Sequence, residues 1–171
     1  MRNVHDLRVA IPAACLLLAL AGCSADGTRS AGPFEPQLAG VGLENRPFGG
    51  RCDTRFTFTG PTSLILEMDC QIRGMGRVTG LATQTLTFTP TGILVENTAV
   101  YTTPNGDELH STFSGLGMPD QSQTVITLSG TEFYSGGTGR FANASGSAEL
   151  TGAASLATMT GAFTTLGTLT F

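Results

Sequence analysis

From Arg51 onward, the sequence predicts an all-β fold, an eight-stranded antiparallel β-barrel, in a chain of 171 residues. Short runs rich in Thr, Val, Ile and Phe are typical of strands, and glycine or proline turns separate them about every eight to twelve residues. No segment carries the apolar stripe of an amphipathic helix. Uniformly short connections favour an antiparallel meander, which closes into a barrel or folds into a sandwich to remove its exposed edges. The even spacing of the turns favours the barrel.

The chain begins with the pattern of an exported protein. Arg2 and Arg8 precede the apolar run of residues 9–20, which is too short to span a bilayer as a helix. The stretch "LAGC", which ends at Cys23, resembles the lipobox of bacterial lipoproteins, where the cysteine becomes the lipid-modified first residue of the mature chain. We therefore expect a lipoprotein signal peptide at residues 1–22 and a membrane anchor on Cys23. The alternative is a plain secretory signal.

Residues 23–50 are rich in Gly, Pro, Ala and Ser and show no sustained period. This composition predicts a flexible tether between the lipidated cysteine and a barrel domain at residues 51–171. Ser24 after the cysteine resembles the pattern of lipoproteins that are not retained at the inner membrane. We therefore expect an envelope protein, at the outer membrane if the cell has one.

The clearest element of the barrel is the hairpin "CDTRFTFTGPTSLILEMDC" at residues 52–70. Antiparallel pairing about Pro61 sets Cys52 opposite Cys70, at the close Cβ separation that a disulfide needs. The other two cysteines belong to the signal peptide and the anchor, so these two remain in an oxidising compartment. A redox pair or a metal site is disfavoured because there is no C-x-x-C spacing and one histidine remains after the signal.

The same register makes one face of the hairpin apolar and the other charged. On the charged face Arg55 meets Glu67, and the repulsion between Asp53 and Asp69 is expected to be relieved by Arg51 and Arg55. On the apolar face, three further pairs of residues lie opposite each other across the two strands: Phe58 and Leu64, Phe56 and Leu66, and Thr54 and Met68.

Six further runs complete the predicted meander. The dipeptide Asn105-Gly106 is a strong hairpin signal because both residues tolerate positive φ. A repeat solenoid is disfavoured, since no fixed period carries through the chain. The predicted strands are Ala82–Thr89, Ile93–Thr102, Glu108–Ser114, Thr124–Tyr134, Ser147–Ala153 and Thr158–Phe171.

The stretch "GGTGRFANASG" at residues 136–146 fits the G-x-G-x-x-G/A spacing of a dinucleotide-binding turn. A phosphate site of that kind needs a helix directly after the glycines. The residues that follow, "NASGSAELTG", favour turns and strands instead. We therefore predict no nucleotide, no other cofactor and no metal.

The same stretch carries a resemblance in the pattern G-G-x-G-x-F-x-x-A-x-G, formed by Gly136, Gly137, Gly139, Phe141, Ala144 and Gly146. It resembles the corner shared by plant dirigent proteins, allene oxide cyclases and uncharacterised bacterial proteins with an allene-oxide-cyclase-like barrel. The resemblance implies an eight-stranded antiparallel barrel with an apolar interior, often assembled into homo-oligomers. In physical terms the glycines permit a tight bulged corner, Phe141 plugs the barrel end, and Arg140 hydrogen-bonds nearby carbonyls.

Charge and motif content narrow the classes of function. The chain has nine basic and thirteen acidic residues, a formal net charge of −4 and no basic cluster, which excludes nucleic-acid binding. His110 has the parity of a surface position, and Tyr101 and Tyr134 are expected to pack at strand ends. There is no G-x-S-x-G elbow, and after the predicted signal peptide there is no histidine besides His110 for a triad, so no catalytic residue is predicted.

Three functions remain open. The leading one is a non-enzymatic envelope domain that binds a small hydrophobic ligand inside the barrel, against the apolar face of the first hairpin. An isomerase or cyclase of the allene-oxide-cyclase-like type requires two or more ionisable side chains inside the barrel and a cleft open to solvent. A structural or adhesive module requires an apolar-filled barrel and an exposed patch or oligomer interface.

Overall fold

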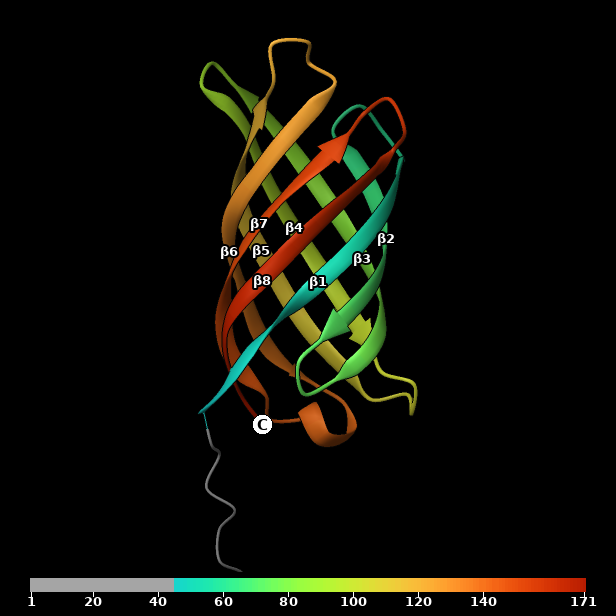
Figure 1. The fold of residues 1–171 in the computed structure, drawn as a ribbon, viewed down its shortest axis with the longest axis vertical. Helices are drawn as coiled ribbons and strands as arrows, with labels where there is room; N and C mark the ends of the chain where they lie inside the picture. Colours follow the sequence, from blue (N-terminus) through green and yellow to red (C-terminus); the bar gives the residue numbers. More distant parts are fainter. Residues whose placement is uncertain (1–44) are drawn as a thin grey trace, which may run out of the picture. The chain divides into compact units, whose positions relative to one another are not determined.

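The computed structural model describes residues 45–171, which form a closed antiparallel barrel of eight strands (Figure 1). Each strand pairs with its neighbours in chain order, and β8 pairs with β1 to close the barrel, which confirms the predicted fold class. In this part of the chain, no helical segment has the length and apolar character to cross a bilayer. The elements are β1 (Asn45–Phe58), β2 (Ser63–Ile72), β3 (Gly76–Thr89), β4 (Gly92–Thr102), β5 (Glu108–Pro119), β6 (Val125–Gly137), η1 (Gly139–Phe141), β7 (Ser145–Ser155) and β8 (Thr160–Thr170).

Several strands extend further than the sequence predicts, most of all β1, β3 and β5. β1 begins at Asn45, β3 begins at Gly76, and β5 continues to Pro119. Glycine has a low strand propensity, but a barrel pairs every strand on both sides and holds such segments extended. At Gly115 of β5 the missing side chain is also a packing requirement, because a Cβ atom there would meet the Phe113 ring. The predicted signal peptide, the lipid-anchor cysteine and the first part of the tether lie outside the described residues.

The first hairpin has the predicted register. β1 and β2 pair with Cys52 opposite Cys70 and Arg55 opposite Glu67. The two cysteines form the expected disulfide, and both side chains are buried in the barrel interior. The apolar face of the hairpin therefore faces inward and the charged face points to solvent.

On the outer face, one of the two arginines that offset the repulsion between Asp53 and Asp69 differs from the expected one. Arg51 lies 3.5 Å from Asp53, as predicted, but Asp69 is bound by Arg77 of β3 and not by Arg55. The hydrogen bond from the Arg77 guanidinium lowers the pKa of Asp69 below its usual value. The partner was missed because β3 becomes a neighbour of β2 only when the sheet is assembled.

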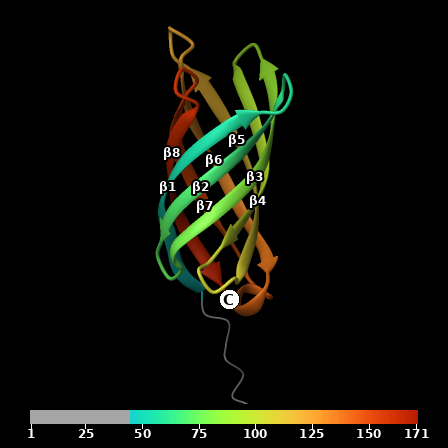
Figure 2. The same cartoon turned by 90° about the vertical axis from the view of Figure 1, so that its right-hand side faces the viewer.

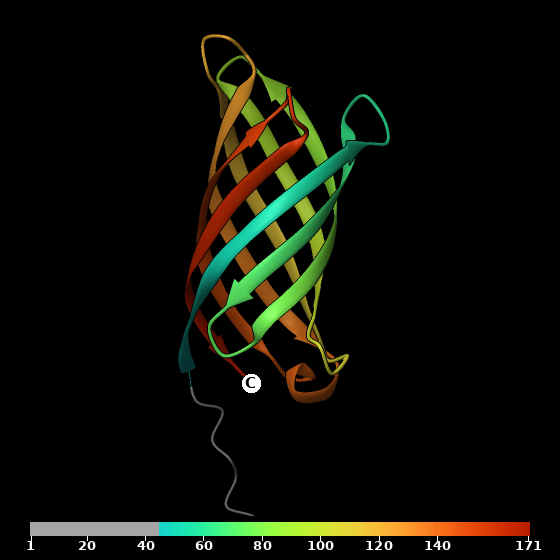
Figure 3. The ribbon, with the colours of Figure 1, turned by 45° about the vertical axis from the view of Figure 1, so that its right-hand side comes forward.

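The two ends of the barrel differ. The connections β2–β3, β4–β5 and β6–β7 lie at the end where β1 begins, which we call the closed end (Figure 2). The connections β1–β2, β3–β4, β5–β6 and β7–β8 lie at the opposite end, which we call the open end (Figure 3). Side chains alternate between the barrel interior and the outer surface along every strand, so the core is the barrel interior.

The glycine-rich corner caps the closed end. Phe141 is fully buried there and its ring centroid lies 5.0 Å from that of Phe171. The β5–β6 register shifts next to Gly136, whose φ of +89° is a conformation that glycine adopts readily, so the corner is bulged as predicted. Arg140 stacks over the Phe141 ring at 4.7 Å and lies 3.7 Å from Asp107, in place of the expected carbonyl contacts.

The other corner glycines meet neighbouring chain segments closely. A Cβ atom on Gly137 would overlap the Glu108 carbonyl, and one on Gly139 would overlap the Asp107 carboxylate. Gly139 also begins η1, a three-residue 3₁₀ turn that the sequence did not predict. These glycines therefore serve close packing of the β4–β5 and β6–β7 connections.

Candidate functional site

The open end holds an apolar cavity, which we call the apolar cup. Its volume is about 90 Å³, and the polar groups on its wall include Thr54 and Gln84. Inward-facing side chains from several strands line it, among them Phe56, Phe58, Leu64, Leu66, Val95 and Ile126. Four of these belong to the apolar face of the first hairpin, where the sequence located a ligand surface.

The distribution of side-chain volume explains why the cavity lies at this end. The closed end is filled by aromatic side chains, with Phe48 and Tyr134 packed edge to face at 4.8 Å between ring centroids. At the open end β7 contributes Gly152 and Ala154 to the wall, which leave the centre of the barrel unfilled. The cavity thus lies where the side chains on this part of the wall are small.

Exposed apolar side chains gather at the open end, and Phe58 among them also lines the cup. They are Phe58, Phe88, Met118 and Met159, each between 40 and 63% exposed. All four lie at or beside the connections of the open end. The entrance to the cup is therefore apolar, as its wall is.

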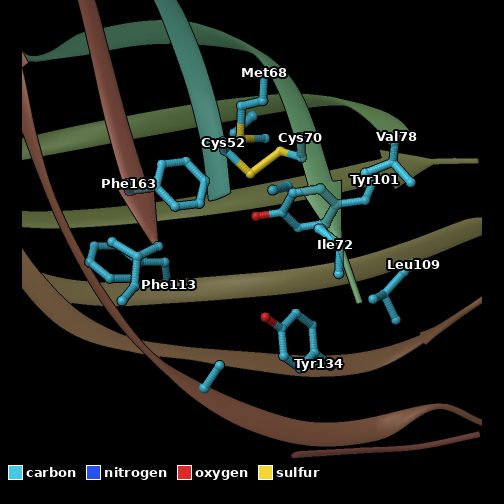
Figure 4. Close-up of a cluster of buried hydrophobic side chains, with 14 of the residues drawn as sticks. Cys52, Met68, Cys70, Ile72, Val78, Tyr101, Leu109, Phe113, Tyr134 and Phe163 are labelled. Atoms are coloured by element: carbon cyan, nitrogen blue, oxygen red, sulfur yellow. A yellow bond between two sulfur atoms is a disulfide. The ribbon is translucent and has the colours of Figure 1, made fainter. Parts of the chain in front are cut away.

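A buried polar group, the Glu132 cluster, lies deeper in the barrel. Glu132 of β6 is 1% exposed. Its Oε1 accepts hydrogen bonds from the Tyr101 hydroxyl and the Ser111 hydroxyl, both at 2.7 Å. Its Oε2 accepts one from the Tyr134 hydroxyl at 2.9 Å. Figure 4 shows both tyrosines inside the barrel, among apolar side chains.

Burial dominates the electrostatics of this cluster. It raises the pKa of the Glu132 carboxyl above its ordinary value of 4.5, against the opposing effect of the three hydroxyl donors. It also raises the pKa of Tyr101 and of Tyr134, and the nearby Glu132 carboxylate adds to both shifts. Glu132 therefore holds a proton at higher pH than an exposed carboxyl does, while both tyrosines stay neutral.

A second, smaller cavity of about 20 Å³ lies against both regions, since it shares Leu66, Leu128 and Phe163 with the wall of the cup. Its wall includes Asn97, Tyr101 and Glu132. Gln84 lines both this cavity and the cup, and it lies opposite Asn97 in the β3–β4 register. The buried Oδ1 of Asn97 has no hydrogen-bond partner among the described residues. Polar groups thus begin where the apolar cup ends.

The sequence analysis gave two members of the cluster a different role and missed two. Tyr101 and Tyr134 lie near strand ends, as expected, but they are buried and donate to Glu132 instead of packing at an edge. Glu132 and Ser111 were not singled out, because an acidic residue in a strand is read as a surface residue. The available signal was parity, since Glu132 shares a face of its strand with Tyr134.

The remaining predicted residues lie away from the cavities. His110 points outward, half exposed, with Nε2 at 3.4 Å from a Glu108 carboxylate oxygen, as its parity predicted. The corner residues Gly136, Gly137, Gly139, Phe141, Ala144 and Gly146 lie at the closed end. Among residues 45–171, no group of three His, Cys, Asp or Glu side chains is placed to hold a metal ion.

The barrel and its two cavities were compared with known proteins. No protein-family model, no curated protein and no solved structure matches this chain. The resemblance of the glycine corner to the allene oxide cyclase and dirigent group therefore stays a prediction. The site consists of an apolar cup at the open end and a buried carboxyl deeper in the barrel.

Proposed function

We propose that this protein binds a small hydrophobic molecule in the apolar cup. One observation carries the proposal: the barrel is plugged by aromatic side chains at the closed end and left unfilled, with apolar walls, at the open end. Mouths of β-barrels are common sites for such ligands. Transfer of apolar surface from water into such a cavity is favourable by roughly 25 cal/mol per Å².

The size of the cup limits the ligand. A volume of about 90 Å³ is well below that of sites for drug-sized molecules, which hold roughly 300 to 1,000 Å³. A short aliphatic chain or a single small ring fits this limit. The exposed apolar rim, with Phe88 as its most exposed member, provides the entry surface.

Filling the cup tests the proposal. Ala154→Phe places a ring into the cavity and is expected to weaken the binding of n-octane at least tenfold, because ligand and side chain compete for one volume. Methyl NMR shifts of Leu64, Leu66 and Ile126 report the binding. Thr151→Phe, at an exposed position on the same strand and outside the wall of the cup, is the matched control and is expected to bind as the wild type does. An absence of saturable shifts in the wild type would show that the cup binds no such molecule.

An isomerase or cyclase is the second candidate, and the Glu132 cluster favours it. The cluster supplies the ionisable side chains inside the barrel that such an enzyme requires. However, the wall of the cup contains no ionisable side chain among the described residues, and Glu132 lines only the smaller cavity. Chromatography of a bound ligand before and after incubation separates the two functions, since an isomerase returns a product of equal mass and different retention. The unfilled cup counts against a purely structural module.

For the location, we propose a lipid-anchored envelope protein with its anchor on Cys23. The first strand, β1, begins at the closed end of the barrel, opposite the mouth of the cup (Figure 1). An anchor on the N-terminal side of β1 is therefore compatible with a free mouth. Cys23→Ser is expected to move the protein from the membrane fraction to the soluble fraction, because it removes the acylation site. Ser24→Ala serves as the control and should stay with the membrane. If the Cys23→Ser protein still sediments with membranes, the anchor assignment is wrong.

A further inference from the structure

The two cavities together define a site that is apolar at the mouth and polar at depth. The cup takes hydrocarbon, and the smaller cavity beneath it offers the amides of Gln84 and Asn97. A buried polar atom without a partner is costly, and Asn97 Oδ1 is such an atom. A ligand that is hydrocarbon throughout leaves this atom as it is, whereas a ligand with one polar end can satisfy the amide.

The charges of the site select among polar ends. Neither cavity wall contains an arginine or a histidine among the described residues, and the chain has no lysine. A carboxylate at depth would lie without a cation and near the Glu132 carboxyl, which disfavours it strongly. An ammonium group is disfavoured because three hydroxyl donors already fill most of the roughly four acceptor sites of the Glu132 carboxyl. A neutral polar end is therefore the one that the site accepts.

Hydrogen-bond chemistry restricts which neutral polar group the ligand can carry. A side-chain amide has a donor side and an acceptor side, and rotation about its last bond presents either one. A hydroxyl group both donates and accepts, so it matches the Asn97 amide in either orientation and can reach Gln84 on the facing strand. We propose that the ligand is an aliphatic alcohol, with its chain in the cup and its hydroxyl on the Asn97 and Gln84 amides. This inference rests on the proposed function.

Asn97→Leu tests this proposal in the full chain. The change removes the amide but keeps the number and branching of the side-chain heavy atoms, and it eliminates a buried unsatisfied atom, so the barrel is expected to fold. The affinity for 1-octanol should fall about tenfold, since one buried hydrogen bond is lost. The affinity for n-octane should stay within about twofold of the wild type. Thr98→Leu, the next residue on the outer face of β4, is the matched control and should change neither.

The outcomes distinguish this inference from the proposed function. If n-octane binds but Asn97→Leu leaves 1-octanol binding unchanged, the hydroxyl assignment is wrong and the cup still binds apolar molecules. If neither probe binds the wild type, both proposals are overturned. Octanoate bound as tightly as 1-octanol would also overturn the inference. So would octylamine bound most tightly and lost in Glu132→Gln, because Glu132 would then anchor a cation.

Discussion

Replacement of Glu132 by alanine is expected to lower the free energy of unfolding by about 3 kcal/mol. The Tyr101, Ser111 and Tyr134 hydroxyls all donate to this carboxyl inside the barrel, and each loses its acceptor in the variant. A buried donor without a partner costs about 1 to 3 kcal/mol. Urea unfolding of the wild type and the variant measures the difference.

Glu132→Gln is the control, because glutamine keeps the shape: its Oε1 can accept from the Tyr101 and Ser111 hydroxyls, and its Nε2 can donate to the Tyr134 hydroxyl oxygen. Its stability at pH 5 should lie within about 1 kcal/mol of the wild type. If Glu132→Ala is as stable as the wild type while Glu132→Gln is not, the hydrogen-bond network does not stabilise the barrel as described.

The stability of the wild type is expected to depend on pH in a way that the stability of Glu132→Gln does not. Burial raises the pKa of folded Glu132 above its ordinary value of 4.5, so between these two values the folded state binds more protons than the unfolded state. The contribution of Glu132 to stability is therefore largest below pH 4.5 and is lost as the pH rises through the folded pKa. Glu132→Gln does not titrate and should lack this loss. A wild type and a glutamine variant with parallel stability profiles from pH 5 to pH 9 would contradict the raised pKa.

Removal of the disulfide is expected to destabilise the barrel by a similar amount. The bond joins Cys52 to Cys70, with a sequence separation of 18, for which the chain-entropy model gives about 3 kcal/mol. The double variant with alanine at both positions should unfold at a correspondingly lower urea concentration. Under a strong reductant the wild type should lose most of its advantage over the variant, because the cross-link then constrains neither protein.

Peptide mapping without reductant provides the direct check. It should recover one peptide pair linked through Cys52 and Cys70. Free thiols at both positions would refute the disulfide and the register of the first hairpin together. Unchanged stability of the alanine double variant would show that the bond contributes little beyond the strand pairing itself.

The first hairpin shows how much of the structure local sequence pattern can predict. A tight turn at Pro61 leaves one antiparallel register, and alternation along two strands then assigns every side chain to a face. The apolar face must be inside, which puts Phe56 and Leu66 in the cup before any tertiary contact is known. Where glycines interrupt the pattern, as around Gly115 in β5, local propensity ends a strand that the neighbouring strands extend.

The cluster around Glu132 shows what local pattern leaves out. Tyr101 and Glu132 are 31 residues apart and lie on strands that do not pair with each other, so their contact exists only because the barrel curves. A buried acidic residue is rare, and its inward position becomes reasonable only when three hydroxyl donors are known to converge on it. Neither the donors nor their convergence is visible in any short window of sequence.

By itself, the sequence determined the all-β class, the number of strands, the register of the first hairpin and its disulfide, because all of these follow from turns and alternation between neighbouring segments. The tertiary structure decided where the interior is filled and where it is empty, which partner Asp69 takes, and which polar groups meet beneath the cup. The physical reason is closure. Curving the sheet until β8 meets β1 brings side chains from distant strands to one axis, and their summed volume and hydrogen-bonding needs are properties of the whole ring of strands.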